Sequence, residues 1–166
     1  MLADSYIVPE CIVRPGSFGG LMALYESNFI KLDRLTGMLA DDVSELISIV
    51  PGDERLMLAI ESASKYTRCL RLTYLFEEEA GEVADPDLIV RVYLDARMTE
   101  VRGWANYHRH RVLDGLSQRF RTELDRRWSE NMMFSKWLDY LFDCGHSFTN
   151  GKSLSRVAEE STEING

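Results

Sequence analysis

The sequence has few cysteines, and their spacing excludes the sites that cysteines usually build. Cys11, Cys69 and Cys144 are its three cysteines, and no two of them form a CxxC pair. An odd number of widely spaced cysteines provides neither a disulfide framework nor a zinc knuckle. The chain also lacks a run of about 18 consecutive apolar residues, the length of a membrane-spanning helix. We therefore expect no structural disulfide, no cofactor and no membrane span.

Positive charge is also scarce. Lys and Arg number 19 against 27 Asp and Glu, which gives a formal net charge of -8. Such a chain is repelled by nucleic-acid backbones and anionic membranes, so we expect neither as a partner. The N-terminal stretch MLADSYIVPECIVRPG contains Asp4 and no basic region before an apolar run, unlike a signal peptide. The expected location is a reducing cytoplasm.

Familiar catalytic and metal-binding motifs are absent from the sequence. The pair Gly19-Gly20 lacks the preceding strand and following lysine of a phosphate loop, and no G-x-S-x-G motif occurs. His108 and His110 are close in sequence, as are Cys144 and His146, but neither pair completes a recognisable set of metal ligands. We expect no metal site and assign no catalytic residue.

Two stretches have the apolar periodicity of helices. From Phe18, apolar residues recur at helical spacing, with Ser17 suited to cap the start and Gly37 suited to end the helix in a left-handed conformation. This predicts a helix over 18–36. A second apolar stripe begins near Trp128 and stops at Gly145, which predicts a C-terminal helix.

The middle of the chain is typical of short strands. Apolar and polar residues alternate over five stretches that are separated by turn-forming residues. The expected strands are 45–50, 55–62, 67–77, 88–94 and 97–104. The acidic stretch 77–87 contains Gly81 and Pro86 and is predicted to be a mobile hairpin loop.

These elements predict an α+β fold. An antiparallel meander of about five strands has one apolar face, and the N-terminal and C-terminal helices are available to cover it. Residues 17–146 then form a single domain, after an irregular lead-in at 1–16 and before a disordered polar tail at 147–166.

The register of the last hairpin follows from its apolar pattern. With Asp95 and Ala96 at the tip, or with a four-residue loop of the same register, Val90 pairs with Val101 and Arg91 pairs with Glu100. This arrangement keeps the valines on the core face.

Polar side chains of several strands are expected on the opposite face. A solvated face is the favoured interpretation, because alternating charges are common there and perturbed clusters mark sites only statistically. The alternative is a shallow pocket in which arginine binds a phosphate or carboxylate and a carboxylate acts as general base. The candidate ligand-binding residues are Glu61, Arg71, Arg91, Tyr93 and Glu100.

Four separated blocks of sequence carry a resemblance to a known family. They are NFIKLDRL (28–35), ESASKYT (61–67), VRVYLDARMTEV (90–101) and WLDYLFDCG (137–145). In this order they resemble the YqiB-like proteins, a family of small uncharacterised proteobacterial proteins, over about 28–145. The resemblance implies a bacterial, cytoplasmic protein, and it carries no activity, substrate or cofactor.

The sequence thus favours a non-catalytic binding or interaction domain over an enzyme. The expected partner is an unknown protein or a small-molecule anion, and a homodimer is compatible with the sequence. The alternative is a small enzyme or metabolite-binding protein that holds a phosphorylated or carboxylated ligand on the polar sheet face. The arginine-rich segment 102–127 is interpreted as solvated or paired with the acidic stretch 77–87, because few aromatic residues interleave with its arginines for base stacking.

Overall fold

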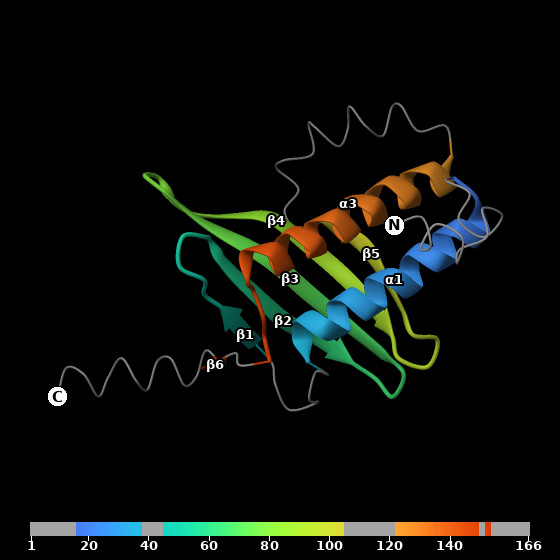
Figure 1. Cartoon of the computed structure of the whole chain (residues 1–166), viewed down its shortest axis with the longest axis horizontal. Helices are drawn as coiled ribbons and strands as arrows, with labels where there is room; N and C mark the ends of the chain where they lie inside the picture. The colour runs from blue at the N-terminus through green and yellow to red at the C-terminus, as the bar shows by residue number, and fades with distance from the viewer. Residues whose placement is uncertain (1–15, 38–44, 105–121, 150–151, 154–166) are drawn as a thin grey trace, which may run out of the picture.

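The computed structural model describes residues 16–37, 45–104, 122–149 and 152–153. Two helices lie side by side over one face of an antiparallel sheet, which confirms the predicted α+β fold (Figure 1). The strand order across the sheet is β5-β4-β3-β2-β1-β6. The elements are α1 (Phe18–Thr36), β1 (Glu45–Ser48), β2 (Arg55–Ala63), β3 (Thr67–Glu78), β4 (Gly81–Tyr93), β5 (Met98–Trp104), α3 (Glu123–Cys144) and β6 (Lys152–Ser153).

Helix α1 begins and ends at the predicted residues. The Ser17 hydroxyl accepts a hydrogen bond from the Gly20 N–H at 3.0 Å. Gly37 has a φ of 65°, and its N–H donates to the Asp33 carbonyl at 2.8 Å. Both ends satisfy backbone groups that a helix terminus otherwise leaves unpaired.

The main core lies between the sheet and the two helices. It is made largely of leucines, and truncation of one such buried leucine to alanine typically costs about 2–5 kcal/mol. The members with 0 % exposure are Leu35, Leu56, Leu70, Leu72, Val90, Leu138 and Leu141.

A smaller cluster joins the N-terminal half of α1 to the start of α3. Leu21, Leu24, Tyr25 and Trp128 are its buried members, and Met98 of β5 packs against them. Further along the two helices, the Asn28 amide nitrogen donates to the Asn131 carbonyl at 3.2 Å. These contacts fix α1 against α3, with β5 contributing Met98.

The β4–β5 hairpin has the predicted register. Val90 pairs with Val101, Arg91 with Glu100 and Tyr93 with Met98, and the tip is the four-residue turn 94–97. Val90 and Val101 are both buried. The period-two pattern therefore identified the faces of both strands correctly.

The stretch 77–87 is not a loop, and that prediction was wrong. Strands β3 and β4 continue through it as a long hairpin, with the chain reversal at 79–80. The strand tolerates Pro86 because the register between β3 and β4 shifts at this point. Asp85 and Pro86 together lie opposite one residue of β3, Tyr74, and so form a bulge. A proline at a bulge removes no hydrogen bond from the ladder.

The C-terminal part differs from the prediction at both ends. Helix α3 begins at Glu123, five residues before Trp128, where the apolar stripe in the sequence begins. The Thr122 side chain caps the helix by accepting a hydrogen bond from the Asp125 N–H. Beyond the predicted domain end at 146, Phe148 is buried in the core, and Lys152–Ser153 pair with β1. Residues 1–15 and 154–166 lie outside the described residues, so the lead-in and most of the predicted tail stay predictions.

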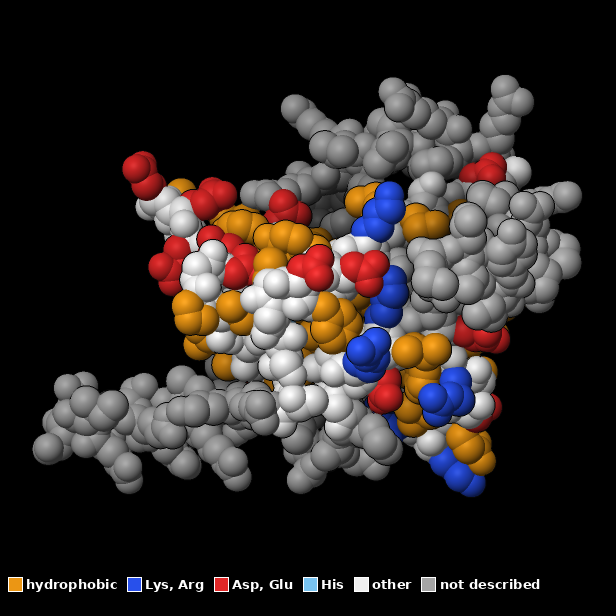
Figure 2. All heavy atoms as spheres, viewed as in Figure 1, with side chains coloured by type: hydrophobic (Ala, Val, Ile, Leu, Met, Phe, Trp, Pro, Cys, Tyr) orange, Lys and Arg blue, Asp and Glu red, His pale blue; other side chains and the backbone are white. Residues whose placement is uncertain are grey.

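Charge is unevenly distributed over the surface. Acidic side chains gather over the tip of the β3–β4 hairpin, at the left of Figure 2. Glu77 and Glu82 there form ion pairs with Arg55 of β2. No described helix has the length and apolar character needed to cross a lipid bilayer.

Candidate functional site

A cavity of about 320 Å³ lies between α1 and the β4–β5 hairpin. Its volume and its largely apolar wall with a few polar groups are typical of small-molecule pockets, which span roughly 300–1,000 Å³. The described lining residues are Phe29, Leu32, Asp33, Thr36, Arg68, Val92, Leu94, Arg97 and Thr99.

The periodicities of helix and sheet bring these residues together. Phe29, Leu32, Asp33 and Thr36 follow i, i+3, i+4 and i+7 spacing, so they share one face of α1. Across the sheet, Arg68 pairs with Val92 and Val92 pairs with Thr99, which places one residue of each of β3, β4 and β5 in a single row. The cavity is bounded by that helix face, this row and the hairpin turn.

Two arginines and one aspartate are the charged residues in the described part of the lining. Arg68 is only 9 % exposed, and its Nη1 donates to the backbone carbonyls of Ser64 and Thr67. The Arg97 guanidinium lies over the Phe29 ring, 4.9 Å from the centroid. Within the described part of the chain, Arg97 has no hydrogen-bond or ion-pair partner.

Arg97 has an unusual backbone conformation. Its φ is 53°, the one positive value among the described non-glycine residues. Glycine or asparagine usually occupies such a position, because a Cβ there is sterically disfavoured. Non-glycine residues in this region cluster at ligand clamps and active sites. The strained turn directs attention to the mouth of the cavity.

Thr99 carries a buried hydroxyl without a partner. Its side chain lines the cavity and is 0 % exposed, and its Oγ1 has no hydrogen bond to any described residue. Leaving such a group unsatisfied costs about 1–3 kcal/mol. A ligand that bonds to Thr99 would offset this cost.

Arg71, one of the predicted site residues, is committed to an internal ion pair. Its Nε and Nη2 donate to the two carboxylate oxygens of Asp87 at 2.8 and 2.6 Å. The Thr73 hydroxyl also donates to Asp87, which is 2 % exposed. Hydrogen bonding to Asp87 raises the pKa of Arg71, and the charge of the exposed Glu61 contributes in the same direction.

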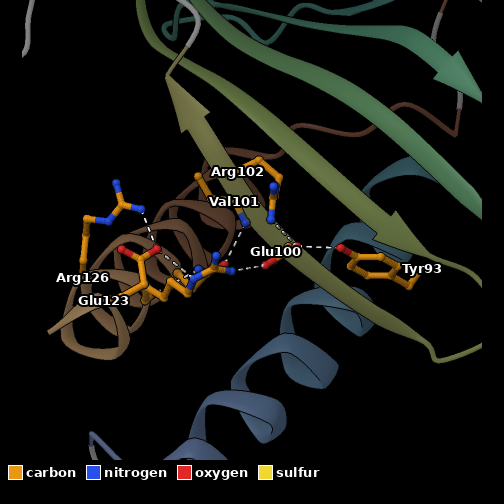
Figure 3. A network of polar contacts seen from close by, with 8 residues as sticks. Tyr93, Glu100, Val101, Arg102, Glu123 and Arg126 are labelled. Carbon is orange, nitrogen blue, oxygen red and sulfur yellow. Dashed lines mark hydrogen bonds and ion pairs between the residues drawn. The ribbon is translucent and has the colours of Figure 1, made fainter.

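Glu100 lies at the centre of a second polar network (Figure 3). It is 4 % exposed and accepts hydrogen bonds from the Tyr93 hydroxyl at 2.7 Å and from Arg127 of α3 at 3.2 Å. Arg102 approaches at 3.5 Å. Burial raises the pKa of Tyr93, and the hydrogen bond to Glu100 raises it further, so this phenol remains a donor.

The structure brings three of the five predicted site residues together. Arg91 and Glu100 are cross-strand partners, and Tyr93 bonds to Glu100. Arg71 belongs to the separate Asp87 network. The buried Nε of Arg91 has no partner among the described residues, but neither described cavity includes Arg91, Tyr93 or Glu100.

A serine, a histidine and an aspartate meet at the C-terminal end of α3. The buried His146 places Nδ1 3.0 Å from the Ser48 hydroxyl and Nε2 2.9 Å from an Asp53 carboxylate oxygen. A hydrolase triad needs an accessible nucleophile, whereas Ser48 is buried and its hydroxyl accepts from the Ser147 N–H. Tyr74 also donates to Asp53. The arrangement therefore joins the end of α3 to β1, β3 and the turn after β1.

Metal binding finds no support in the part of the chain that is described. No group of three or more histidine, cysteine, aspartate or glutamate side chains there is arranged to hold an ion. His108 and His110 lie outside the described residues, as does most of the arginine-rich segment 102–127. Of that segment, Arg102 and Arg127 pair with Glu100 and not with the 77–87 stretch.

A second cavity, of about 300 Å³, lies between α3 and the bulge of β4. Its wall is mostly apolar and includes Met133, Phe134 and Trp137. Glu130 also lines it, and burial raises the pKa of this carboxyl. Among the described residues of the lining, the polar side chains are the carboxyls of Asp85 and Glu130, and the Trp137 indole is the one N–H donor.

Sequence reasoning missed the residues that line the first cavity. Thr99 and Arg68 belong to strands whose other residues alternate regularly, and both occupy positions that the alternation assigns to the core face. A polar residue at a core-facing position was therefore the sequence signal that could have pointed to this cavity. No sequence signal pointed to Arg97, because its left-handed backbone at the end of the turn is visible only in the structure.

Comparison with known proteins places the chain among uncharacterised sequences. Residues 31–147, well over half of the chain, match the family described as "Protein of unknown function (DUF1249)". No curated protein and no solved structure matches. The resemblance to an uncharacterised family is thereby confirmed, whereas the YqiB-like name and a proteobacterial origin stay predictions.

Proposed function

Because the chain belongs to the DUF1249 family, for which no function is described, we propose its function from its own geometry: it is a non-catalytic domain that binds a small molecule in the cavity between α1 and the β4–β5 hairpin. The observation that carries the proposal is the unpartnered buried hydroxyl of Thr99, a residue that lines this cavity. A buried polar group without a partner is rare in folded proteins and calls for an explanation.

The surroundings of the cavity agree with binding rather than catalysis. Its described polar lining consists of two arginines, an aspartate and two threonines, without a histidine, cysteine or lysine. Arginine remains protonated at all physiological pH values and cannot shuttle protons. The cytoplasmic location predicted from the sequence is part of the proposal.

Thr99→Val tests the proposal, because valine keeps the side-chain shape and removes only the hydroxyl. We expect the free energy of unfolding of the ligand-free protein to fall by less than about 0.5 kcal/mol or to rise, since no internal hydrogen bond is lost. Urea denaturation measures this quantity. A loss of about 1 kcal/mol or more would show that the hydroxyl already has a partner in the free protein.

Ligand binding is measured on the same variant by NMR titration with a library of anionic, neutral and cationic fragments. We expect fragment-induced shifts at Phe29, Val92 and Thr99 in the original chain and weaker binding in Thr99→Val. Thr67→Val makes the same change outside the cavity and should bind as the original chain does. If no fragment shifts the cavity residues, the proposal is wrong.

The polar face predicted from the sequence stays a second candidate. The buried Nε of Arg91 favours it, because this donor has no partner among the described residues. The fragment titration distinguishes the two sites, since a ligand on this face would shift Arg91 and Tyr93 instead. Native mass spectrometry of the full chain would identify a copurified ligand and would also test the predicted homodimer.

A further inference from the structure

We propose that the cavity between α3 and the bulge of β4 is a second binding site, for a small apolar molecule that carries one ammonium group. The ammonium group binds next to the Glu130 carboxyl. The apolar part lies against Met133, Phe134 and Trp137, which line the same cavity. This inference goes beyond the proposed function, because the two cavities share no described lining residue.

The cavity has the size and the wall of a small-molecule site. Its volume of about 300 Å³ lies at the lower end of the range for such pockets, which suits a single ring with a short substituent. Its apolar wall consists of Pro86 and Leu88 from β4 and of Met133, Phe134 and Trp137 from α3. Met133 is exposed whereas Phe134 is buried, so the wall extends from the surface to the core. An apolar group that enters the cavity loses contact with water, which favours binding.

Helix geometry places Glu130 beside this apolar wall. Glu130, Met133, Phe134 and Trp137 follow i, i+3, i+4 and i+7 spacing, so they share one face of α3. Glu130 thus lies one helical turn before Phe134, on the face that borders the cavity. Burial at this position raises the pKa of the carboxyl, because removal of water disfavours its charged form.

No described side chain neutralises Glu130. Among the charged groups that act on it, Arg126 lowers its pKa most, but burial outweighs this effect. The Arg126 guanidinium donates to Glu123 at 2.6 Å, so its direct ion pair is made elsewhere. None of the described residues forms a hydrogen bond or an ion pair with Glu130. A cation in the cavity would provide the missing counter-charge.

The rest of the described lining favours a cation over an anion or a neutral ligand. It contains no lysine, arginine or histidine, so an anion would meet only the repulsion of the carboxyls. A neutral ligand would cover Glu130 without giving the charged form a partner, which is costly. Asp85 also lines the cavity but already has an interaction partner, so Glu130 is the carboxyl that we assign to the ammonium group.

NMR titration of the full chain with three ring compounds tests this inference. Benzylamine, benzyl alcohol and benzoate have similar size and differ in charge. We expect benzylamine to shift the Trp137 indole N–H and the Phe134 amide. It should bind there at least about tenfold more tightly than benzyl alcohol, because a charge-assisted pair is worth about one power of ten. Benzoate should bind more weakly than either.

Glu130→Gln assigns the effect to the charge, because glutamine keeps the shape of the side chain. The variant should bind benzylamine about as weakly as it binds benzyl alcohol. It should fold as the original chain does, since no described residue bonds to Glu130, and urea denaturation verifies this. Glu26→Gln makes the same change of charge at an exposed position of α1 and should leave all three affinities unchanged.

The pKa of Glu130 provides a readout that filling of the cavity alone would not produce. Carboxyl 13C NMR measures it with and without each compound. A bound ammonium group favours the charged carboxylate, so saturating benzylamine should lower this pKa, whereas benzyl alcohol should leave it unchanged or raise it. The affinity for benzylamine should accordingly fall as the pH falls through the pKa of Glu130.

Other charged groups near Glu130 are common to both measurements. Glu123, Arg126 and Arg127 of α3 act on Glu130, and Asp85 of β4 lines the same cavity. Because these groups are present with and without the compound, the change in the pKa of Glu130 reports on the bound ammonium group.

The possible outcomes separate this inference from the proposed function. Equal or tighter binding of benzyl alcohol or benzoate at Trp137 would overturn the inference, as would an unchanged preference for benzylamine in Glu130→Gln. A pKa of Glu130 that does not fall with benzylamine, or absence of shifts at Phe134 and Trp137 with all three compounds, would also overturn it. The proposed function is measured by shifts at Phe29 and Val92 in the other cavity, so it stands or fails separately.

Discussion

Asp53 is a single carboxylate that connects segments far apart in the sequence. It receives hydrogen bonds from Tyr74 of β3 and lies 2.9 Å from His146, which follows α3. Burial by itself would raise the pKa of Asp53, but the hydrogen bonds from Tyr74, from the Glu54 backbone and from His146 together lower it. A carboxyl with a lowered folded-state pKa stabilises the protein above its unfolded pKa, and this contribution is lost as the pH falls through the folded pKa.

Asp53→Asn should therefore destabilise the protein in a pH-dependent manner. We expect a loss of about 1–3 kcal/mol near pH 7, because two buried partners lose a charged acceptor. The difference from the original chain should begin to shrink as the pH falls below about 4, the ordinary pKa of an aspartate in an unfolded chain, and it should continue to shrink as the pH falls through the lowered folded-state pKa of Asp53. Urea denaturation of both proteins between pH 3 and pH 7 measures this difference in the free energy of unfolding. A difference that does not change with pH would contradict the proposed role of the charge.

Gly37 ends α1 at a point where a second segment passes close by. Its φ of 65° disfavours most residues with a side chain, and a Cβ at this position would overlap the Thr149 side chain. Gly37→Ala should cost about 1–2 kcal/mol from the left-handed backbone, plus the displacement of Thr149. Gly52→Ala is the matched control, because Gly52 has a φ of 83° and no atom within 4 Å of its added Cβ. Equal losses in thermal denaturation would mean that the contact with Thr149 costs nothing.

Among the elements, β5 is an edge strand that is protected by a helix. The Asn131 side chain of α3 accepts a hydrogen bond from the Val101 N–H at 2.8 Å and donates to the Arg127 carbonyl at 2.8 Å. A free N–H at a sheet edge is a template for pairing with another chain. Asn131 thus satisfies the strand and blocks intermolecular pairing at the same point.

Asn131→Ala should lower stability and expose this edge. Because Asn131 is 0 % exposed, loss of its side chain leaves the Val101 N–H unpaired, and we expect a cost of about 2–3 kcal/mol. Hydrogen exchange of the Val101 amide should become faster than in the original chain. Ser129→Ala, a half-buried position on the same helix, is the control and should change neither quantity by much. Protection of Val101 that survives in Asn131→Ala would show that another group holds the strand.

The sequence predicted elements best where local signals agreed. Helix α1 was correct at both ends because Ser17 and Gly37 are strong capping residues at the edges of an apolar stripe. The β4–β5 register was correct because a shift by one residue would bury Arg91. The long β3–β4 hairpin was missed because a bulge removes the ladder hydrogen bond that Pro86 cannot form, and sequence alone does not reveal a bulge.

Across the whole molecule, the candidate cavity depends on contacts that no local pattern encodes. Its lining comes from α1, from three strands and from a turn, so it exists only once the helix has packed against the sheet. The predicted polar face, in contrast, followed directly from alternation along the strands. The structure places Arg71 and Glu100 of that face in ion pairs with Asp87 and Arg127. The alternation along one strand could not indicate these pairs, because each partner belongs to another element, Asp87 to β4 and Arg127 to α3.

The burial of Phe148 was not predicted either, because Phe148 stands alone among polar residues in the sequence. Its N–H donates to the Leu35 carbonyl at 2.8 Å, and its side chain is 3 % exposed within the main core. The segment after α3 thus closes the core where α1 ends, next to the contact between Gly37 and Thr149.

Phe148→Ala should consequently cost about 3–5 kcal/mol, as expected for a phenylalanine deleted from a well-packed core. Phe134→Ala, in the middle of α3 and 1 % exposed, provides the reference for a full core position. Phe18→Ala provides the opposite reference, since Phe18 is 67 % exposed and should cost less than about 0.5 kcal/mol. Urea denaturation of the three variants places Phe148 on this scale. A cost close to that of Phe18→Ala would mean that the segment after α3 does not close the core. A cost close to that of Phe134→Ala would show that the cooperatively folding domain continues beyond residue 146.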